Sequence, residues 1–178
     1  LDDEAKLPFG GECVGRIVNV GENIDTALIG RRVIAALTVG SLASHVVARH
    51  EFCMPLPIDM TIEEGASFST VFLTAYYGLI SLANLQKGET VLVHSAAGGV
   101  GQAAIQVIKH LGGRIIATAS KPKHSYLLNQ GVDVVFDSRT NDFADRVLEY
   151  TNGRGVDIVL NSLKGDRVDA SFKSLSKG

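Results

Sequence analysis

The chain has 178 residues, of which 46% are apolar and 20% charged, and its formal net charge is −2. These values are typical of a globular protein with a buried core, and the lack of a basic block excludes a nucleic-acid or polybasic membrane surface. No apolar run is long enough to span a membrane, and the acidic residues 1–4 do not resemble a signal peptide. We therefore expect a cytoplasmic protein without a membrane or nucleic-acid partner.

The two cysteines, Cys13 and Cys53, are too few for a disulfide scaffold. They form no CxxC pair and have no histidine at metal-ligand spacing, so we interpret them as small buried apolar residues in a reducing compartment. Residue 1 is a leucine, and a helical pattern runs almost to residue 178. We therefore expect a segment of a longer protein.

The first sixty residues show short β-rich runs that alternate with turn residues. The runs at 13–20, 32–37 and 44–48 predict three strands, the last of them rich in β-branched residues. Pro55 and Pro57 then predict a loop. This part of the chain has the pattern of a small β domain.

After residue 60 the pattern becomes helical and then alternates. Thr61 and Glu64 form a capping box, and the mostly apolar stretch 65–82 predicts a buried helix pair, with Tyr76 and Tyr77 in the core. Four strands are expected at 90–94, 114–119, 132–136 and 156–160, with helices at 100–111, 124–130, 141–150 and 166–175. This alternation predicts an α/β fold with a parallel, right-handed Rossmann-type sheet.

The predicted sheet has fewer strands than a complete dinucleotide-binding domain. Such a domain has about six parallel strands, and we identify four. We therefore expect a Rossmann domain that is incomplete at its C-terminal end. An incomplete sheet leaves an exposed edge, and association through it, as in a homodimer, remains open.

A glycine-rich turn follows the first strand of this sheet. The strand at 91–93 leads into residues 96–101, which form the GxGxxG fingerprint with Ala96 at its first position. Small residues allow a tight turn and close approach of a pyrophosphate, which the N-terminus of the next helix attracts. The alternative is a glycine loop that binds nothing. The flanking strand and helix favour a cofactor site at Ala97, Gly98, Gly99, Val100 and Gly101.

The end of the second strand indicates which cofactor binds. An NAD site has Asp or Glu about 20 residues beyond the glycines, whereas Ser120 stands here, followed by Lys121 and Lys123. A hydroxyl and nearby cations accept a ribose 2′-phosphate, which a carboxylate would repel. We therefore predict NADPH rather than NADH. The alternative is that these lysines are only solvated residues at a helix start.

Polar residues also follow the third and fourth strands, whose carboxyl ends lie at the ligand-binding edge of such sheets. Asn161 and Ser162 follow the fourth strand and are candidates to face the cofactor, with a plain turn as the alternative. Ser138 and Arg139 follow the third strand and are candidates for the adenosine end, with a solvated loop as the alternative.

Several stretches resemble one family. Residues 88–101 resemble medium-chain dehydrogenases/reductases of the zinc-free, quinone-reductase branch, and residues 62–66 and 74–79 resemble the helix pair that precedes this motif. Residues 155–163 with 169–171 resemble the enoyl reductase domains of polyketide and fatty acid synthases. The resemblance covers essentially the whole chain.

The resemblance assigns residues 1–60 to part of a GroES-like catalytic domain and residues 61–178 to the NADPH-binding Rossmann domain. Residues 10–15 occupy the place of the GHExxG motif of zinc-dependent relatives, and Gly11 stands where their histidine ligand would be. No four-cysteine zinc loop is present, so we expect no metal. Residues 30–33 resemble the family's GDRV turn, with Arg31 in place of Asp, a departure that the sequence does not explain.

The resemblance implies an enoyl reductase in which NADPH gives hydride to an α,β-unsaturated thioester. Its partners would be an acyl chain on an acyl carrier protein and neighbouring synthase domains. Asn161 and Ser162 then match the nicotinamide side, Thr74 matches a residue near the nicotinamide amide, and Lys121 or Lys123 matches the 2′-phosphate contact. No catalytic residue is assigned. The alternatives are a stand-alone NADPH quinone or enone reductase and a non-catalytic NADPH-binding module.

Overall fold

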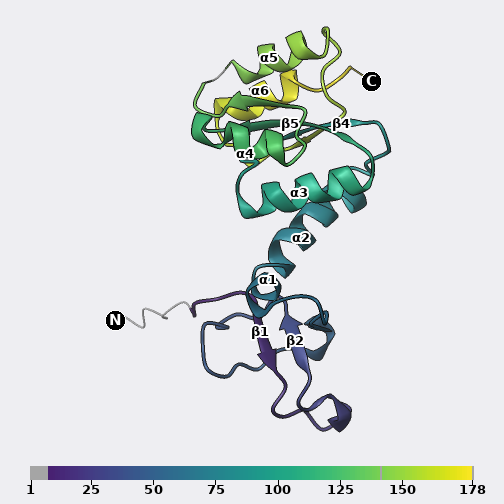
Figure 1. Ribbon diagram of the computed structural model, residues 1–178, viewed down its shortest axis with the longest axis vertical. Helices are drawn as coiled ribbons and strands as arrows, with labels where there is room; N and C mark the ends of the chain where they lie inside the picture. The colour runs from purple at the N-terminus through teal and green to yellow at the C-terminus, as the bar shows by residue number, and fades with distance from the viewer. Residues whose placement is uncertain (1–7, 141, 178) are drawn as a thin grey trace. The chain divides into compact units, whose positions relative to one another are not determined.

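The computed structural model describes residues 8–140 and 142–177. Two compact units are distinguished, Leu1–Val71 and Phe72–Gly178 (Figure 1). The helical residues that follow Thr61 are therefore shared between the two units. No helix among the described residues is long and apolar enough to cross a membrane.

The first unit contains a three-stranded antiparallel sheet in the order β1-β2-β3. The strands are β1 (Cys13–Arg16), β2 (Arg32–Ala35) and β3 (Cys53–Pro55), with short 3-10 helices at Thr26–Leu28 and His50–Phe52. Pro55 is tolerated because β3 pairs only with β2 in this sheet, and an edge strand can lack an N–H group.

The strand predicted at 44–48 is wrong. That segment has no regular structure, and Val47 is 98% exposed. The open edge of β2 is instead taken by β3, through the pairs Ala35 with Cys53 and Val33 with Pro55. A strand needs a partner as well as β-branched residues, and residues 44–48 find none among the described residues.

The turn of helix α1 (Ile62–Ala66) packs against one face of this sheet. Thr61 and Glu64 form the predicted capping box. A Cβ atom at Gly65 would lie 2.5 Å from Leu56 Cδ1 and 2.8 Å from Val14 Cγ2, so any larger residue would require these side chains to move. Close packing of α1 therefore fixes the start of the helical segment.

The carboxylate of Glu12, the residue just before β1, is hydrogen-bonded to the N-terminus of helix α2 (Ser69–Tyr76). The Glu12 carboxylate accepts hydrogen bonds from the Ser69 hydroxyl and, at 2.7 Å, from the Thr70 N–H. A negative charge at a helix N-terminus is favourable because the N–H groups there lack partners in the helix. Glu12 therefore links the β1 region to α2 within the first unit.

The stretch at 65–82 is largely helical, as predicted, but half of its residues are exposed, so the predicted burial is wrong. After α2 the chain continues as a π-helical segment, η3 (Tyr77–Leu82). Ala75 and Leu79 are buried. Tyr76 and Tyr77 are 57% and 60% exposed, so they do not lie in the core, contrary to the prediction. The uniformly apolar composition gave no period that could mark the single buried stripe.

The second unit is a four-stranded parallel sheet in the order β6-β5-β4-β7. Its strands are β4 (Thr90–Val93), β5 (Arg114–Ala119), β6 (Val134–Asp137) and β7 (Ile158–Leu160). The helices are α3 (Gly99–His110), α4 (His124–Asn129), α5 (Phe143–Tyr150) and α6 (Asp166–Lys173), with a 3-10 turn, η4, at Lys121–Lys123. Helix α3 lies on one face, and α5 and α6 lie on the other (Figure 1). The predicted Rossmann-type sheet is confirmed.

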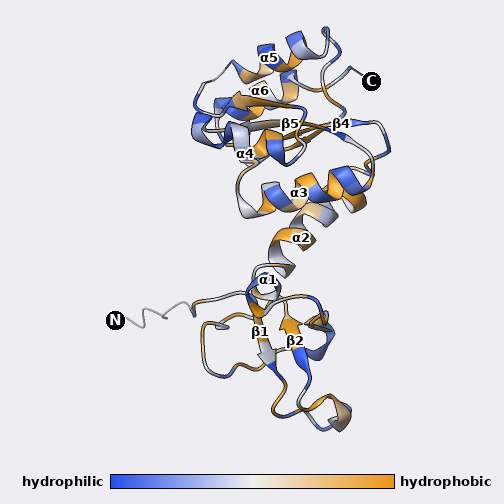
Figure 2. Ribbon diagram, viewed as in Figure 1, coloured by the Kyte–Doolittle hydropathy of each residue, from blue (hydrophilic) through white to orange (hydrophobic). Residues whose placement is uncertain are grey.

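The sheet is the core of this unit, and its central strands are among its most hydrophobic segments (Figure 2). Leu92, Ile116, Phe143 and Val147 are at most 2% exposed and pack together between the sheet and α5. Burial of this apolar surface is the main force that orders the strands.

Two Gly-Val-Asp sequences fix the register of neighbouring strands. Asp133 precedes β6, and its carboxylate accepts a hydrogen bond from the Ile115 N–H at 2.6 Å. Asp157 precedes β7 and accepts from the Thr90 N–H at 2.8 Å. Each aspartate thus pairs with a backbone group near the start of the adjacent strand, where the sheet ladder ends.

Candidate functional site

The order of the strands creates a switch point beside β4. From β4 the chain moves outward through β5 to β6, and then returns to place β7 on the opposite side of β4. The loops after β4 and β7 therefore depart in opposite directions, which is where such sheets bind ligands. The His94 N–H still reaches the Leu160 carbonyl at 3.2 Å, and the Ser162 hydroxyl donates to the Ser95 hydroxyl at 3.0 Å. These bonds hold Ser162 beside the glycine turn.

The backbone of the glycine turn is tightly folded and closed by a hydrogen bond. Ser95 has φ of +52°, and the Gly98 N–H donates to the Ser95 carbonyl at 2.8 Å. A Cβ atom at Gly101 would lie 2.5 Å from Cα of Ala96, so no other residue fits without a backbone shift. Gly101 therefore serves the close packing of α3 on the turn.

The N-terminus of α3 is open to an anion. Its N-cap, Gly98, provides no side-chain hydrogen bond. Gly98 and Gly99 are exposed, and Ala97 and Val100 are half-buried. The first N–H groups of a helix lack intrahelical acceptors and carry partial positive charge. The arrangement fits a pyrophosphate, as the sequence predicts.

The ends of β5 and β6 bring cations and one carboxylate together. Ser120 is half-buried and begins η4, whereas Lys121 and Lys123 are exposed. Lys121 Nζ lies 3.9 Å from the Asp137 carboxylate, whose side chain is only 16% exposed. Asp137 was missed from the sequence because the third strand was predicted to end one residue earlier. It lowers the net positive charge beside Ser120.

The residues after β6 are tied to α6. The Arg139 N–H donates to the Asp137 carboxylate at 3.1 Å, and the Arg167 guanidinium donates to the Ser138 carbonyl at 3.2 Å. Ser138 is half-buried and Arg139 is exposed. The loop after β6 is therefore held by a side chain from α6.

Besides Ser162, two residues are assigned to the nicotinamide side, Asn161 and Thr74. The Asn161 side chain donates to the Leu163 carbonyl and accepts from the Leu163 N–H, both at 3.1 Å, so it braces its own loop. Thr74 is exposed on α2, one turn before Gly78. A Cβ atom at Gly78 would lie 3.3 Å from Leu160 Cδ1, so the π-helical segment η3, which follows α2, approaches the end of β7.

A buried histidine, not singled out in the sequence, lies directly beneath the turn. His94 is 3% exposed, with Nδ1 2.9 Å from Thr118 Oγ1 and Nε2 3.1 Å from Ser171 Oγ. The Phe143 ring meets it edge-on, with centroids 4.9 Å apart. Burial, followed by the positive charge of Arg167, lowers the pKa of His94 to about 4. The imidazole is therefore neutral at physiological pH.

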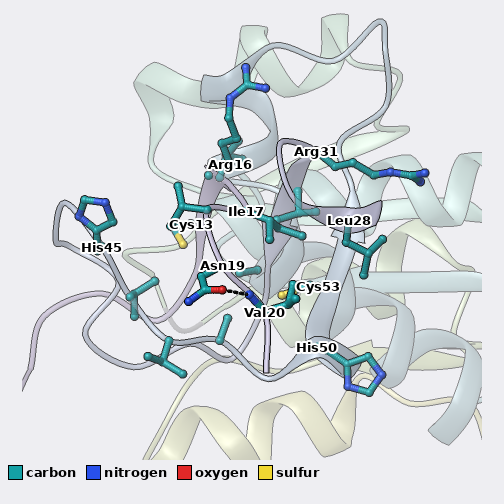
Figure 3. A pocket seen from close by; sticks show the side chains of 18 of the residues that line it. Cys13, Arg16, Ile17, Asn19, Val20, Leu28, Arg31, His45, His50 and Cys53 are labelled. Carbon is teal, nitrogen blue, oxygen red and sulfur yellow. Dashed lines mark hydrogen bonds between the residues drawn. The ribbon is translucent and has the colours of Figure 1, made fainter. Parts of the chain in front are cut away.

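A hollow of about 1000 Å³ lies in the first unit, on the sheet face that carries Cys13, Ala35 and Cys53 (Figure 3). Burial raises the pKa of both half-buried cysteine thiols; for Cys53, Cys13 and Glu51 add to the effect. None of the predicted cofactor residues lines this hollow. Within residues 8–140 and 142–177, no group of three or more His, Cys, Asp or Glu side chains is arranged to hold a metal ion.

Solved structures with this arrangement identify the family. The CurK enoyl reductase superimposes with a TM-score of 0.93 at 43% identity, covering 96% of this chain and 52% of that one. The chain belongs to the medium-chain dehydrogenase/reductase family. The family model described as "Zinc-binding dehydrogenase" matches residues 99–178. A mycobacterial member of known structure, complexed with NADPH, has a TM-score of 0.88 at 36% identity, covering 96% of this chain and 54% of that one.

The sequence relatives are much larger proteins, and this chain aligns with one segment of each. A phenolphthiocerol/phthiocerol polyketide synthase of Mycobacterium tuberculosis is 42% identical over 177 residues, which is 99% of this chain and 8% of that protein. The chain therefore spans about half the length of the solved reductases and a small part of the synthases.

Proposed function

We propose that this chain is the cofactor-binding part of an NADPH-dependent enoyl reductase of a polyketide synthase. The observation that carries the proposal is the intact glycine turn at the β4–β7 switch point, with Ser162 hydrogen-bonded to Ser95 beside it. The likeness to the CurK enoyl reductase and to polyketide synthase segments supports the reaction class. The substrate would be an α,β-unsaturated acyl thioester on an acyl carrier protein.

The described residues fit NADPH at the pyrophosphate and at the ribose phosphate. The N–H groups at the start of α3 would bind the pyrophosphate, through the turn formed by Ala97, Gly98, Gly99, Val100 and Gly101. Ser120, Lys121 and Lys123 would bind the 2′-phosphate through charge-assisted hydrogen bonds. Ser138 and Arg139 would lie at the adenosine end, and Thr74, Asn161 and Ser162 would lie at the nicotinamide side.

The bound cofactor would supply the hydride that adds to the β-carbon. The residues of this chain would hold the cofactor at the switch point and exclude other orientations of its nicotinamide end, because the Ser162–Ser95 bond fixes the loop on that side. We assign no proton donor. Tyr76 and Tyr77 are exposed helix residues with no described partner that would prepare either for proton transfer.

The proposal extends to the surroundings of the chain. Neighbouring synthase domains and an acyl carrier protein are the proposed partners, because the relatives are parts of multidomain synthases. A cytoplasmic location is consistent with two free cysteines. Outer strands β6 and β7 each have an unpaired edge in the described sheet, through which a homodimer could form.

Cofactor binding tests the first half of the proposal. NADPH and NADH titrations of the wild-type chain should show clear preference for NADPH. A variant combining Ser120→Asp, Lys121→Ala and Lys123→Ala should lose that preference, because it places a carboxylate where the phosphate would bind. If the variant still binds NADPH far better than NADH, the proposed 2′-phosphate site is wrong.

Turnover tests the second half. NADPH consumption by the natural full-length polypeptide should be measured with a crotonyl-pantetheine thioester and with a simple quinone. Preference for the thioester supports the enoyl reductase. Preference for the quinone assigns the chain to the stand-alone quinone reductases, and NADPH binding without consumption of either substrate supports a non-catalytic module.

A further inference from the structure

A chain of buried polar groups runs from the central sheet to the loop after β7. His94 follows β4 and contacts Thr118 of β5 on one side and Ser171 of α6 on the other. Ser171 Oγ in turn lies 2.9 Å from the Arg167 carbonyl and 3.4 Å from Asn161 Oδ1. None of the three buried residues, His94, Thr118 and Ser171, is among the proposed cofactor contacts.

The hydrogens of this network can be assigned from its acceptors. The Ser171 hydroxyl has a single hydrogen, which is shared between two acceptors, the Arg167 carbonyl at 2.9 Å and Asn161 Oδ1 at 3.4 Å. Ser171 Oγ can then only accept from His94, so Nε2 carries the imidazole hydrogen. Nδ1 is left as an acceptor for the Thr118 hydroxyl at 2.9 Å. Both ring nitrogens of a neutral imidazole are therefore satisfied.

The far end of the network reaches the proposed nicotinamide side. Asn161 Oδ1 accepts from the Leu163 N–H, and the neighbouring Ser162 is hydrogen-bonded to Ser95 of the glycine turn. Ser95 directly follows His94 in the chain. The residues that shape the loop after β7 are thus linked to β4 twice, once through Ser95 and once through the interior path from His94 to Ser171.

We infer that His94 is a positioning residue, which orients α6 and the loop at residues 161–165 against the glycine turn through its Nε2–H bond to Ser171. Its effect on the cofactor rests on the proposed function. Its effect on the loop does not. The bond to Thr118 orients the ring but lies on the side away from this loop, so the two hydrogen bonds of His94 have separable consequences.

Two near-isosteric variants separate the effects of the two His94 hydrogen bonds. Ser171→Ala removes the link to the loop, and Thr118→Val removes a bond of the same imidazole on the β5 side as the matched control. Loss of one positioning hydrogen bond corresponds to about a tenfold effect. Ser171→Ala should weaken NADPH binding about tenfold and speed amide exchange at Leu163 by a similar factor. Thr118→Val should change NADPH affinity and the rate of amide exchange at Leu163 each by less than about threefold.

Variants of the ring itself give a second line of evidence. His94→Phe keeps the aromatic contact with Phe143 but loses both hydrogen bonds, and should reproduce the Ser171→Ala effects. His94→Gln offers one donor and one acceptor and should restore Leu163 protection. In the wild-type chain, ¹⁵N NMR should show His94 protonated at Nε2 alone at neutral pH.

The outcomes distinguish this inference from the proposed function. Equal effects of Ser171→Ala and Thr118→Val, or unchanged Leu163 exchange in His94→Phe, would overturn the positioning role. Protonation of His94 at Nδ1 would also overturn it, since Ser171 would then have no donor from the ring. If the wild-type chain does not bind NADPH, the proposed function fails, while amide exchange and NMR still decide the role of His94.

Discussion

Replacing His94 should change how the stability of the chain depends on pH. In the folded chain the pKa of His94 is lowered to about 4 from the ordinary 6.5. Between these values the unfolded chain binds a proton that the folded chain does not, so the free energy of unfolding falls as the pH falls. One pKa unit corresponds to about 1.4 kcal/mol, which makes the full effect about 3 kcal/mol. This stability is present above pH 6.5 and is lost as the pH falls to about 4.

Urea unfolding of the wild-type chain and of His94→Gln between pH 4 and 7 measures this effect. Carboxylates titrate in both proteins, so the difference between their unfolding free energies isolates the histidine. That difference should move by about 3 kcal/mol in favour of the variant as the pH is lowered across this range. A difference that stays flat with pH would refute the reasoning, because it would mean that His94 can accept a proton in the folded state without penalty.

Substitutions at four further positions test other parts of the structure. Gly101→Ala places a Cβ 2.5 Å from Cα of Ala96 and should destabilise the chain by about 2 kcal/mol, measured by urea unfolding, and weaken NADPH binding. Asp137→Asn removes a carboxylate 3.9 Å from a lysine and should strengthen NADPH binding about threefold by calorimetry, with NADH little changed. Glu12→Ala removes the acceptor at the start of α2 and should lower the free energy of unfolding by about 1–2 kcal/mol, whereas no loss would mean that water replaces it. Asp157→Ala should cost about 1–3 kcal/mol by the same assay, and Asp157→Asn, which keeps an oxygen acceptor, should cost less.

Local pattern was sufficient for much of the second unit. The strand at Arg114–Ala119 was predicted with its observed bounds, and the capping box at Thr61 is present as expected. These features depend on residues that are close in sequence, such as a run of apolar β-formers between glycines or a threonine three residues before a glutamate. The glycine turn belongs to the same class, because a tight turn between a strand and a helix needs small residues at fixed spacing.

Features that depend on pairing between distant segments could not be read in this way. Residues 44–48 have good β-forming composition, yet β2 pairs with Cys53–Pro55 instead. Half of the residues in the apolar stretch at 65–82 are exposed, because composition does not say which surface a helix will meet.

The sequence by itself determined the parallel α/β sheet, the glycine turn and the residue types available for a 2′-phosphate. Only the tertiary structure decided that Asp137 faces Lys121 and that His94 is buried between Thr118 and Ser171. His94 and Ser171 are 77 residues apart and meet only because β4 and α6 pack together. Periodicity records the face that a residue takes within its own element, whereas such contacts depend on how the elements pack.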